Sequence, residues 1–176
     1  IALSKNGDIY IAGQRVLAGT GWAFYLMKNY QEELSVNTVI PPIISPIVTL
    51  SEAGDVYFAG SSFDTTYKAF LWKNRTQLAV PLTHISSIAV SDKDDIYITG
   101  SNELGQTKFL KNGTEQTLEL PTGVTEHYTT KVAVSKNGKV YVAGYYIKNR
   151  IKHAALWVDG KLNEYDASYL ADVVLR

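Results

Sequence analysis

Residues 1–13 read IALSKNGDIYIAG, and the same pattern returns as VTLSEAGDVYFAG at 48–60, IAVSDKDDIYITG at 88–100 and VAVSKNGKVYVAG at 132–144. The central tyrosines are Tyr10, Tyr57, Tyr97 and Tyr141, at spacings of 47, 40 and 44 residues. Four such periods account for the chain of 176 residues. The internal repeat therefore decides the fold.

Each repeat predicts two β-hairpins. In the quoted segments, short runs rich in valine, isoleucine and tyrosine flank a turn cluster such as Asn6-Gly7-Asp8 or Asn137-Gly138. A second hairpin follows as AFYLMKN from Ala23, AFLWKNR from Ala69, KFLKNG from Lys108 and AALWVDG from Ala154. No window of eleven or more residues keeps a helical apolar period with capping signals. The sequence therefore predicts an all-β chain with four strands per repeat.

A four-stranded unit recurring every 40 to 47 residues is typical of a β-propeller, in which each unit is one antiparallel blade packed face to face against the next. We expect blades at about 1–46, 47–86, 87–130 and 131–171, with residues 172–176 beginning a further first strand. Large apolar side chains recur at one position of the third strand and are expected to fill the space between blades. They are Met27, Trp72, Leu110 and Trp157.

The fifth first strand bears on closure of the ring. Four complete blades need four first strands, and the sequence has five. We therefore expect the chain to be part of a larger propeller or to self-associate, while a closed four-bladed ring with one redundant strand remains open. The first residue is Ile1 with no signal peptide ahead of it, so we expect the chain to begin after processing or excision.

Composition excludes several functional classes. The chain has 17 basic and 17 acidic residues, and a formal charge of zero does not favour nucleic acid or an anionic membrane surface. Cysteine is absent from the sequence, which excludes disulfides and thiolate metal sites. No apolar run approaches the roughly 18 residues that suggest a membrane-spanning helix. Hydrophobic residues make up 45% of the chain, which favours a folded globular domain.

The repeat consensus, S-x-x-G-x-V-Y-x-A-G followed by A-x-L-W-K-N-G, resembles the repeats of bacterial secreted β-propeller proteins of unassigned activity. The resemblance covers essentially the whole chain, although the third repeat departs from it at Asp94-Asp95 and at Leu110. It implies a bacterial protein that is secreted or displayed at the cell surface. It also implies that the motif residues are structural, and it identifies no catalytic residue.

Motifs for catalysis and metal binding are not found. The three histidines, His84, His127 and His153, show no metal-ligand spacing, and neither a G-x-S-x-G motif nor a calcium loop is complete. We therefore predict no metal, no cofactor and no catalytic residue. His84 and His127 lie about one repeat apart, where we expect connections between blades at the channel mouth. A hydrolase or lyase that uses one of them as acid or base is the alternative function.

The loops between second and third strands vary most among the repeats, and binding usually resides in variable loops on a regular scaffold. Aromatic rings with polar atoms suit contacts with sugars and with proteins. The predicted binding residues are Trp22, Phe63, Tyr67, His84, His127, Tyr128, Tyr145, Tyr146 and Tyr169. The leading hypothesis is a non-enzymatic binding or scaffold module for a glycan, peptide or protein partner. A structural segment of a larger protein is a further alternative.

Overall fold

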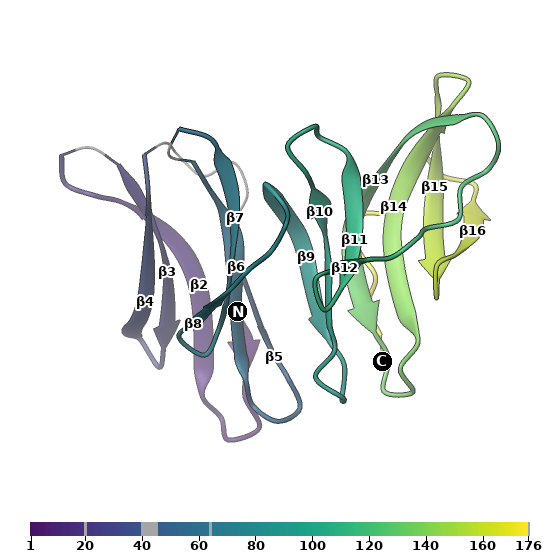
Figure 1. Cartoon of the computed structure of the whole chain (residues 1–176). Coiled ribbons are helices and arrows are strands. Elements are labelled where there is room, and N and C mark those ends of the chain that lie inside the picture. Colours follow the sequence, from purple (N-terminus) through teal and green to yellow (C-terminus); the bar gives the residue numbers. More distant parts are fainter. Residues whose placement is uncertain (20, 40–45, 64, 176) are drawn as a thin grey trace. The chain divides into compact units, whose positions relative to one another are not determined.

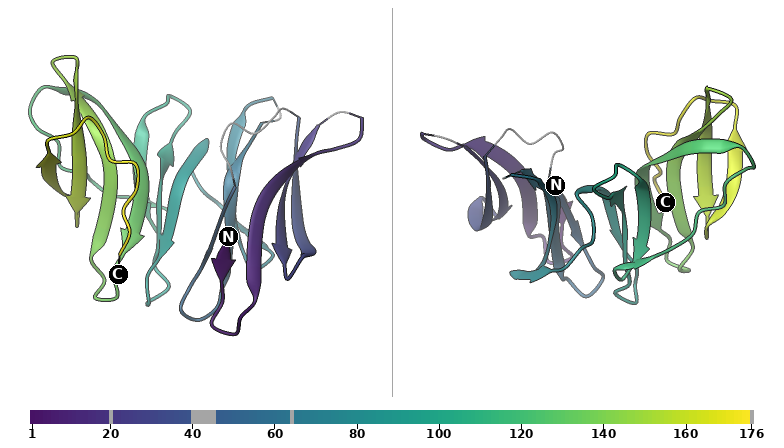
Figure 2. Two further views of the ribbon diagram at one scale, coloured as in Figure 1. Left: turned by 180° about the vertical axis from the view of Figure 1, so that it is seen from behind. Right: turned by 45° about the horizontal axis from the view of Figure 1, so that its top comes forward.

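The computed structural model describes residues 1–19, 21–39, 46–63 and 65–175. In this part of the chain, sixteen strands form four four-stranded antiparallel sheets, and there is no helix (Figure 1). In every sheet, strands that are consecutive in the sequence lie next to each other. The four sheets can also be followed in the further views of Figure 2. The predicted all-β class and the four strands per repeat are confirmed.

The first two sheets have these strands. The first contains β1 (Ala2–Leu3), β2 (Ile9–Val16), β3 (Trp22–Lys28) and β4 (Gln31–Thr38), and the second contains β5 (Ile47–Leu50), β6 (Val56–Phe63), β7 (Tyr67–Lys73) and β8 (Thr76–Leu78). The fourth strands differ greatly in length. β4 pairs with β3 from Gln31 to Thr38, whereas β8 has three residues.

The other two sheets follow the same plan. The third contains β9 (His84–Val90), β10 (Ile96–Ser101), β11 (Thr107–Lys111) and β12 (Thr114–Glu115), and the fourth contains β13 (Val124–Val134), β14 (Val140–Lys148), β15 (Ile151–Val158) and β16 (Lys161–Tyr165). Strand β13 contains irregularities between Val124 and Glu126 and between Thr129 and Lys131. Such bulges change which face of the sheet the following side chains take.

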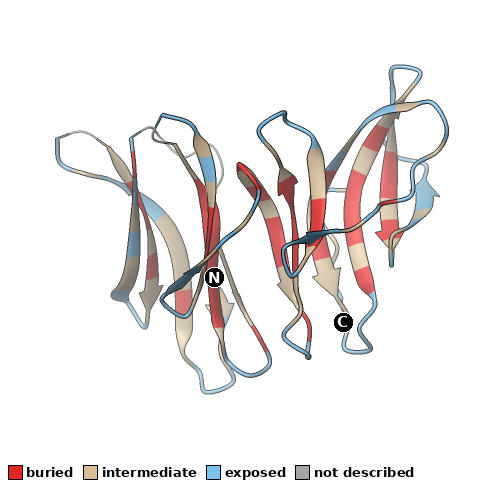
Figure 3. Cartoon of the chain, viewed as in Figure 1, coloured by how far each residue is buried: buried red, intermediate tan, exposed pale blue. Residues whose placement is uncertain are grey.

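The chain divides into two compact units, Ile1–Ile85 and Ser86–Arg176. In the first unit, Tyr10, Phe24, Leu26, Val56, Phe58 and Phe70 form an apolar cluster shared by its two sheets. In the second unit, a corresponding cluster contains Tyr97, Phe109, Leu118, Val132, Val140, Val142, Tyr146, Ala155 and Trp157. Buried residues run along the central strands β6, β10 and β14, whereas the fourth strands are largely exposed (Figure 3).

The recurring large residues of the third strands occupy one register position, as the sequence predicts. Met27, Trp72, Leu110 and Trp157 pair with the corresponding residues of the second strands, Ile11, Phe58, Ile98 and Val142. Leu110 and Trp157 are buried, whereas Met27 and Trp72 are half-buried. The repeat equivalence is therefore confirmed, although the four side chains differ in how well they are covered.

A polar cluster joins the two hairpins at one end of a sheet. Asn74 accepts a hydrogen bond from the Val56 N–H at 2.9 Å and donates one to Asp55 at 2.6 Å. Lys73 forms an ion pair with Asp55 at 2.7 Å and lies over the Tyr57 ring. The same cluster recurs at Asp8, Lys28, Asn29 and Tyr10, and at Asp95, Lys111, Asn112 and Tyr97. In the fourth sheet Lys139 and Val158 replace the aspartate and the lysine, and the Asp159 carboxylate accepts the Val140 N–H.

Two local expectations need correction or stay open. His84 is the first residue of β9 and His127 lies within β13, so neither histidine lies in a connection between sheets as we expected. Both strands begin before the predicted blade starts because their pairing extends further toward the N-terminus. Residues 172–175 have no strand assignment. Because a strand is assigned only where it pairs, the predicted further first strand stays a prediction.

Candidate functional site

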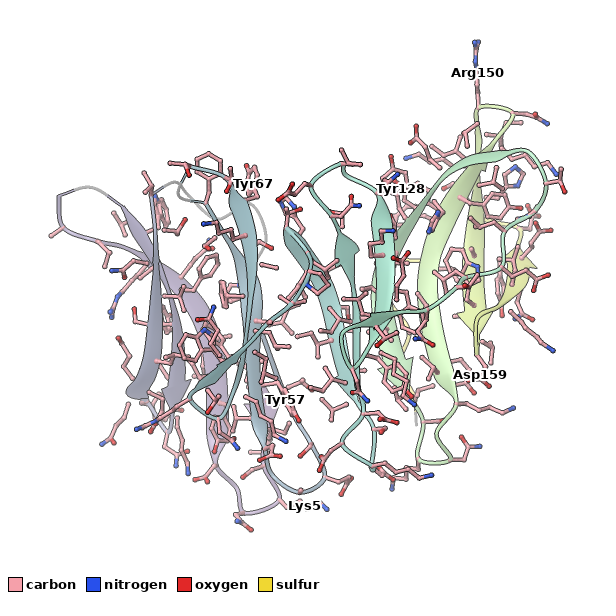
Figure 4. All side chains as sticks on the ribbon, in the orientation of Figure 1. Lys5, Tyr57, Tyr67, Tyr128, Arg150 and Asp159 are labelled. Carbon is pink, nitrogen blue, oxygen red and sulfur yellow. The ribbon has the colours of Figure 1, made fainter. Side chains whose placement is uncertain are left out.

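Three of the predicted binding residues meet in the first unit. Phe63 ends β6, Tyr67 begins β7 and His84 begins β9. The Tyr67 ring centroid lies 4.8 Å from that of Phe63 and 4.7 Å from that of His84. All three side chains are half-buried, and Figure 4 shows Tyr67 at the loop end of β7. Burial lowers the pKa of His84, so its imidazole is neutral at neutral pH.

Trp22 is connected to this cluster through the backbone of its own sheet. It begins β3, and its strand partner is Thr38 at the end of β4. The Thr38 hydroxyl donates to the Phe63 carbonyl at 2.8 Å, and the Phe63 N–H donates to the same hydroxyl at 2.9 Å. Trp22 and Phe63 therefore lie at the same end of the first unit, as the loop prediction required.

In the second unit, four predicted residues divide between the two faces of one sheet. Tyr128 pairs with Tyr145 across β13 and β14, and His127 pairs with Tyr146. Because successive side chains of a strand point to opposite faces, the two pairs do not share a surface. Sequence reasoning treated all four as one loop surface, and it missed this division because the register of a bulged strand is not visible in the residue pattern.

Tyr128, which is exposed, and Tyr145, which is half-buried, form an aromatic platform. Their rings stack with centroids 4.9 Å apart and planes 24° apart. The Lys152 ammonium lies 4.7 Å from the Tyr145 ring centroid, and the Tyr128 hydroxyl donates to the Glu126 carboxylate at 2.5 Å. This hydrogen bond raises the pKa of Tyr128 because the charged phenolate would lose it. Tyr128 is 36% exposed. These four residues are called the tyrosine platform below.

The other pair, His127 and Tyr146, lies on the opposite face of the fourth sheet. Tyr146 is 2% exposed, stacks on His153 with centroids 5.0 Å apart and donates its hydroxyl to Glu164. Burial, followed by Glu164, raises the pKa of Tyr146 to about 12. The His127 ring lies 6.3 Å from the Trp157 ring, and burial, followed by the charge of Lys108, lowers its pKa. Tyr146 is therefore a core residue, and His127 is a half-buried residue whose ring lies beside that of the core residue Trp157.

Tyr169 lies in the segment that follows β16 and is 56% exposed. Backbone hydrogen bonds hold this segment against the fourth sheet, since the Ala154 N–H donates to the Ala167 carbonyl at 2.9 Å and the Leu170 N–H donates to the Gly144 carbonyl at 3.1 Å. The Thr130 hydroxyl also donates to the Leu170 carbonyl at 2.6 Å. Tyr169 is thus an exposed aromatic residue on an anchored segment.

The described residues contain no cluster of three or more metal-ligating side chains. In the same part of the chain, neither His84 nor His127 has an ion pair or hydrogen bond with a carboxylate, and Thr83 is the hydrogen-bond partner of His84. General acid–base catalysis needs such a partner, or a substrate, within hydrogen-bond reach. The described ranges also contain no helix that is long and apolar enough to cross a membrane.

Sequence reasoning missed a pocket between the two sheets of the first unit. Its volume is about 350 Å³. The walls are apolar and comprise Tyr10, Leu26, Leu34, Val56, Phe58 and Trp72, and the polar lining comprises Lys28, Glu33, Asn74, Arg75 and Thr76. The Trp72 indole N–H is buried and has no hydrogen-bond partner among the described residues. The recurrence of Trp72 predicted a filled space between blades, so the pocket has no signal in the repeat pattern.

Comparison with known proteins assigns no family to the chain. The sequence matches no protein-family model, and no curated protein matches it significantly.

Proposed function

We propose that the four sheets are blades of a β-propeller and that the chain is a non-enzymatic binding module of a bacterial secreted or cell-surface protein. Its partner is a glycan, a peptide or a protein. The fourfold repetition of one antiparallel sheet supports the propeller. The resemblance of the repeats to those of secreted bacterial propellers supports the location.

The tyrosine platform is the observation that carries the binding function. It presents the exposed ring of Tyr128, stacked on Tyr145, together with the Lys152 ammonium and the Glu126 carboxylate, and it lies on β13–β15 rather than in the buried cluster. A sugar ring or an apolar side chain of a peptide can pack against the Tyr128 ring, while polar groups elsewhere in the same ligand bond to the two charges. A hydrolase or lyase has less support because the two histidines have no carboxylate partner in the described residues.

A glycan and peptide array probed with the isolated chain tests this function, followed by calorimetry with any ligand it identifies. Tyr145→Ala removes one half of the stack and is expected to weaken binding at least about tenfold, because stacking and burial contribute at least one factor of ten in affinity. Tyr30→Ala is the control, since Tyr30 is an exposed tyrosine on a turn of the first unit.

Two results would overturn the proposal. One is unchanged ligand affinity in Tyr145→Ala together with Tyr128→Ala. The other is hydrolase or lyase activity that copurifies with the chain and disappears in His84→Gln or His127→Gln.

A further inference from the structure

The pocket beside Trp72 has an equivalent place in the second unit. Trp72 pairs with Phe58 of β6 and Gln77 of β8, and Trp157 pairs with Val142 of β14 and Leu162 of β16. The two tryptophans therefore occupy the same position in the same kind of sheet. The segment that covers Trp157 therefore indicates the kind of segment that can bind beside Trp72.

In the second unit, residues 116–120 cover Trp157, and this segment is called the strap. The Trp157 indole N–H donates to the Glu119 carbonyl at 2.7 Å, and the Glu119 N–H donates to the Gly160 carbonyl at 2.8 Å. The Glu119 carboxylate also accepts the Leu162 N–H at 3.3 Å. Leu118 is 8% exposed and belongs to the apolar cluster that contains Trp157. The strap thus supplies one apolar side chain and one carbonyl.

The described residues of the first unit contain no equivalent of the strap. The strand that corresponds to β12 is β4, and β4 is much longer. β12 ends after two residues, which frees the chain to cross to the next sheet, whereas β4 continues along β3 to Thr38. The Val39 N–H then donates to the Phe63 carbonyl at 2.9 Å, at the loop end of the second sheet. Among the described residues the Trp72 N–H has no hydrogen-bond partner, and the pocket lies beside it.

The turn beside the pocket differs in sequence from the turn beside the strap, and one of the differences is an arginine in place of a glycine. Gly160 lets the strap approach closely, since a Cβ there would lie 2.9 Å from the Thr117 carbonyl oxygen. Arg75 stands at the equivalent turn position and forms an ion pair with Glu33 of β4. The Arg75 side chain is 74% exposed. Because Arg75 is exposed and a guanidinium has five N–H donors, Arg75 can bond to a second carboxylate beside Glu33.

We propose that this pocket binds an extended peptide segment of a partner protein, which crosses Trp72 as the strap crosses Trp157 but lies farther from the turn, because Arg75 has the Cβ that Gly160 lacks. A leucine-sized side chain fills the apolar walls, the next carbonyl accepts the Trp72 N–H, and an acidic side chain bonds to Arg75. The apolar walls favour an aliphatic side chain at this place over the hydroxyls of a sugar. The pocket and the tyrosine platform share no residue, so this proposal stands or fails independently of the platform.

The probe is a capped synthetic peptide with the sequence of residues 114–122, TEQTLELPT. The chain has three tryptophans, and Trp72→Phe assigns the Trp72 indole signal in an NMR spectrum of the ¹⁵N-labelled full chain. We expect the Trp72 signal to shift downfield and saturate on titration, because its N–H gains an acceptor. A peptide carrying Leu118→Ala is expected to bind at least about tenfold more weakly, because it loses the buried side chain.

Protein variants test the two polar contacts. Trp72→Phe keeps an aromatic wall but removes the donor, and it should weaken peptide binding about fivefold, as one hydrogen bond is worth. Arg75→Glu should weaken binding of TEQTLELPT and strengthen binding of a peptide carrying Glu119→Lys. Arg15→Glu is the matched control, because Arg15 forms an ion pair with Glu32 outside the pocket lining.

Three outcomes overturn the proposal. They are an unshifted Trp72 signal at millimolar peptide, equal affinity for the leucine and alanine peptides, and a saturable shift produced by a monosaccharide and not by the peptide. Circular dichroism checks the fold of each variant. If Trp72→Phe does not fold, the pair of leucine and alanine peptides and the charge exchange at Arg75 still decide between binding and its absence.

Discussion

Asn74 has two structural roles at the end of the second sheet, one through its backbone and one through its side chain. Its φ is +50°, a left-handed conformation that asparagine adopts more readily than most residues. Its amide also joins the Val56 N–H to the Asp55 carboxylate. Asn29 and Asn112 repeat both features with φ of +49°. The turn and the pairing of the two hairpins are therefore fixed by one side chain.

Asn74→Ala is expected to lower the free energy of unfolding by about 2 kcal/mol, since it loses two hydrogen bonds and the conformational preference. Asn149→Ala is the matched control because Asn149 has a φ of +53° in the β14–β15 turn. No hydrogen bond is formed by the Asn149 side chain within the described residues, so its loss should be about half as large or less. Urea denaturation measures both values, and equal losses would contradict the role assigned to the amide.

His127 predicts a pH dependence of stability. Burial and the charge of Lys108 lower its pKa in the folded state from the ordinary value of 6.5. Between the two pKa values the unfolded chain binds more protons, so the free energy of unfolding rises with pH there. The contribution is complete above pH 6.5 and is lost as the pH falls through the lower folded value. His127→Gln should flatten the curve of unfolding free energy in the range just below pH 6.5, and an unchanged slope in this variant would contradict the assignment.

At the scale of the strand, the glycine of the repeated A-G pattern allows residues of the neighbouring strand to approach its Cα closely. Gly60 pairs with Phe70, and a Cβ on Gly60 would lie 2.6 Å from the Phe70 ring. Gly13 is covered in the same way by the far end of the Tyr25 side chain, whereas Gly144 lies against the backbone carbonyl of Tyr128. The same sequence position thus tolerates an added methyl group to different degrees.

Gly144→Ala is expected to lower the free energy of unfolding by about 3 kcal/mol and to disturb the tyrosine platform, because the Tyr128 backbone has to move. Gly13→Ala should cost less, since the Tyr25 side chain can rotate away. Thermal unfolding measured by circular dichroism compares the two variants. A larger loss for Gly13→Ala would show that the backbone contact is not the limiting one.

At the scale of the whole molecule, the proposed propeller has a consequence for association. Each blade of a propeller buries both faces against neighbours, and soluble monomers seldom expose apolar faces of that size. If the sheets are blades of an open arc, these faces need further blades or a second copy of the chain.

We therefore expect light scattering of this 176-residue chain to give a mass above the monomer value of 19.5 kDa. Tyr165→Ala, at an exposed position of β16, serves as a surface control that should leave the mass unchanged. A mass equal to that of the monomer over a tenfold range of concentration would contradict the prediction of a larger assembly.

The repeat pattern determined the strands because strand alternation and tight turns are local properties of the sequence. Segments such as VTLSEAGDVYFAG contain both, so the four sheets and the shared register of Trp72 and Trp157 were predictable. The repeats also contain a sequence pattern that marks the polar cluster at the end of the sheet. Asp8, Asp55 and Asp95 occur in the three repeats that carry Lys-Asn at the second turn, and the fourth repeat lacks both.

The tertiary structure decided which side chains share a surface. The register of the bulged strand β13 placed His127 on the face of Tyr146, which is buried, and Tyr128 and Tyr145 on the other face, where Tyr128 is exposed and Tyr145 is half-buried. The pocket beside Trp72 depends on the length of the fourth strand. β4 continues to Thr38, whereas β12 ends after two residues and the chain then crosses to the next sheet. These outcomes arise from register and from packing between residues far apart in the sequence, which a local pattern does not encode.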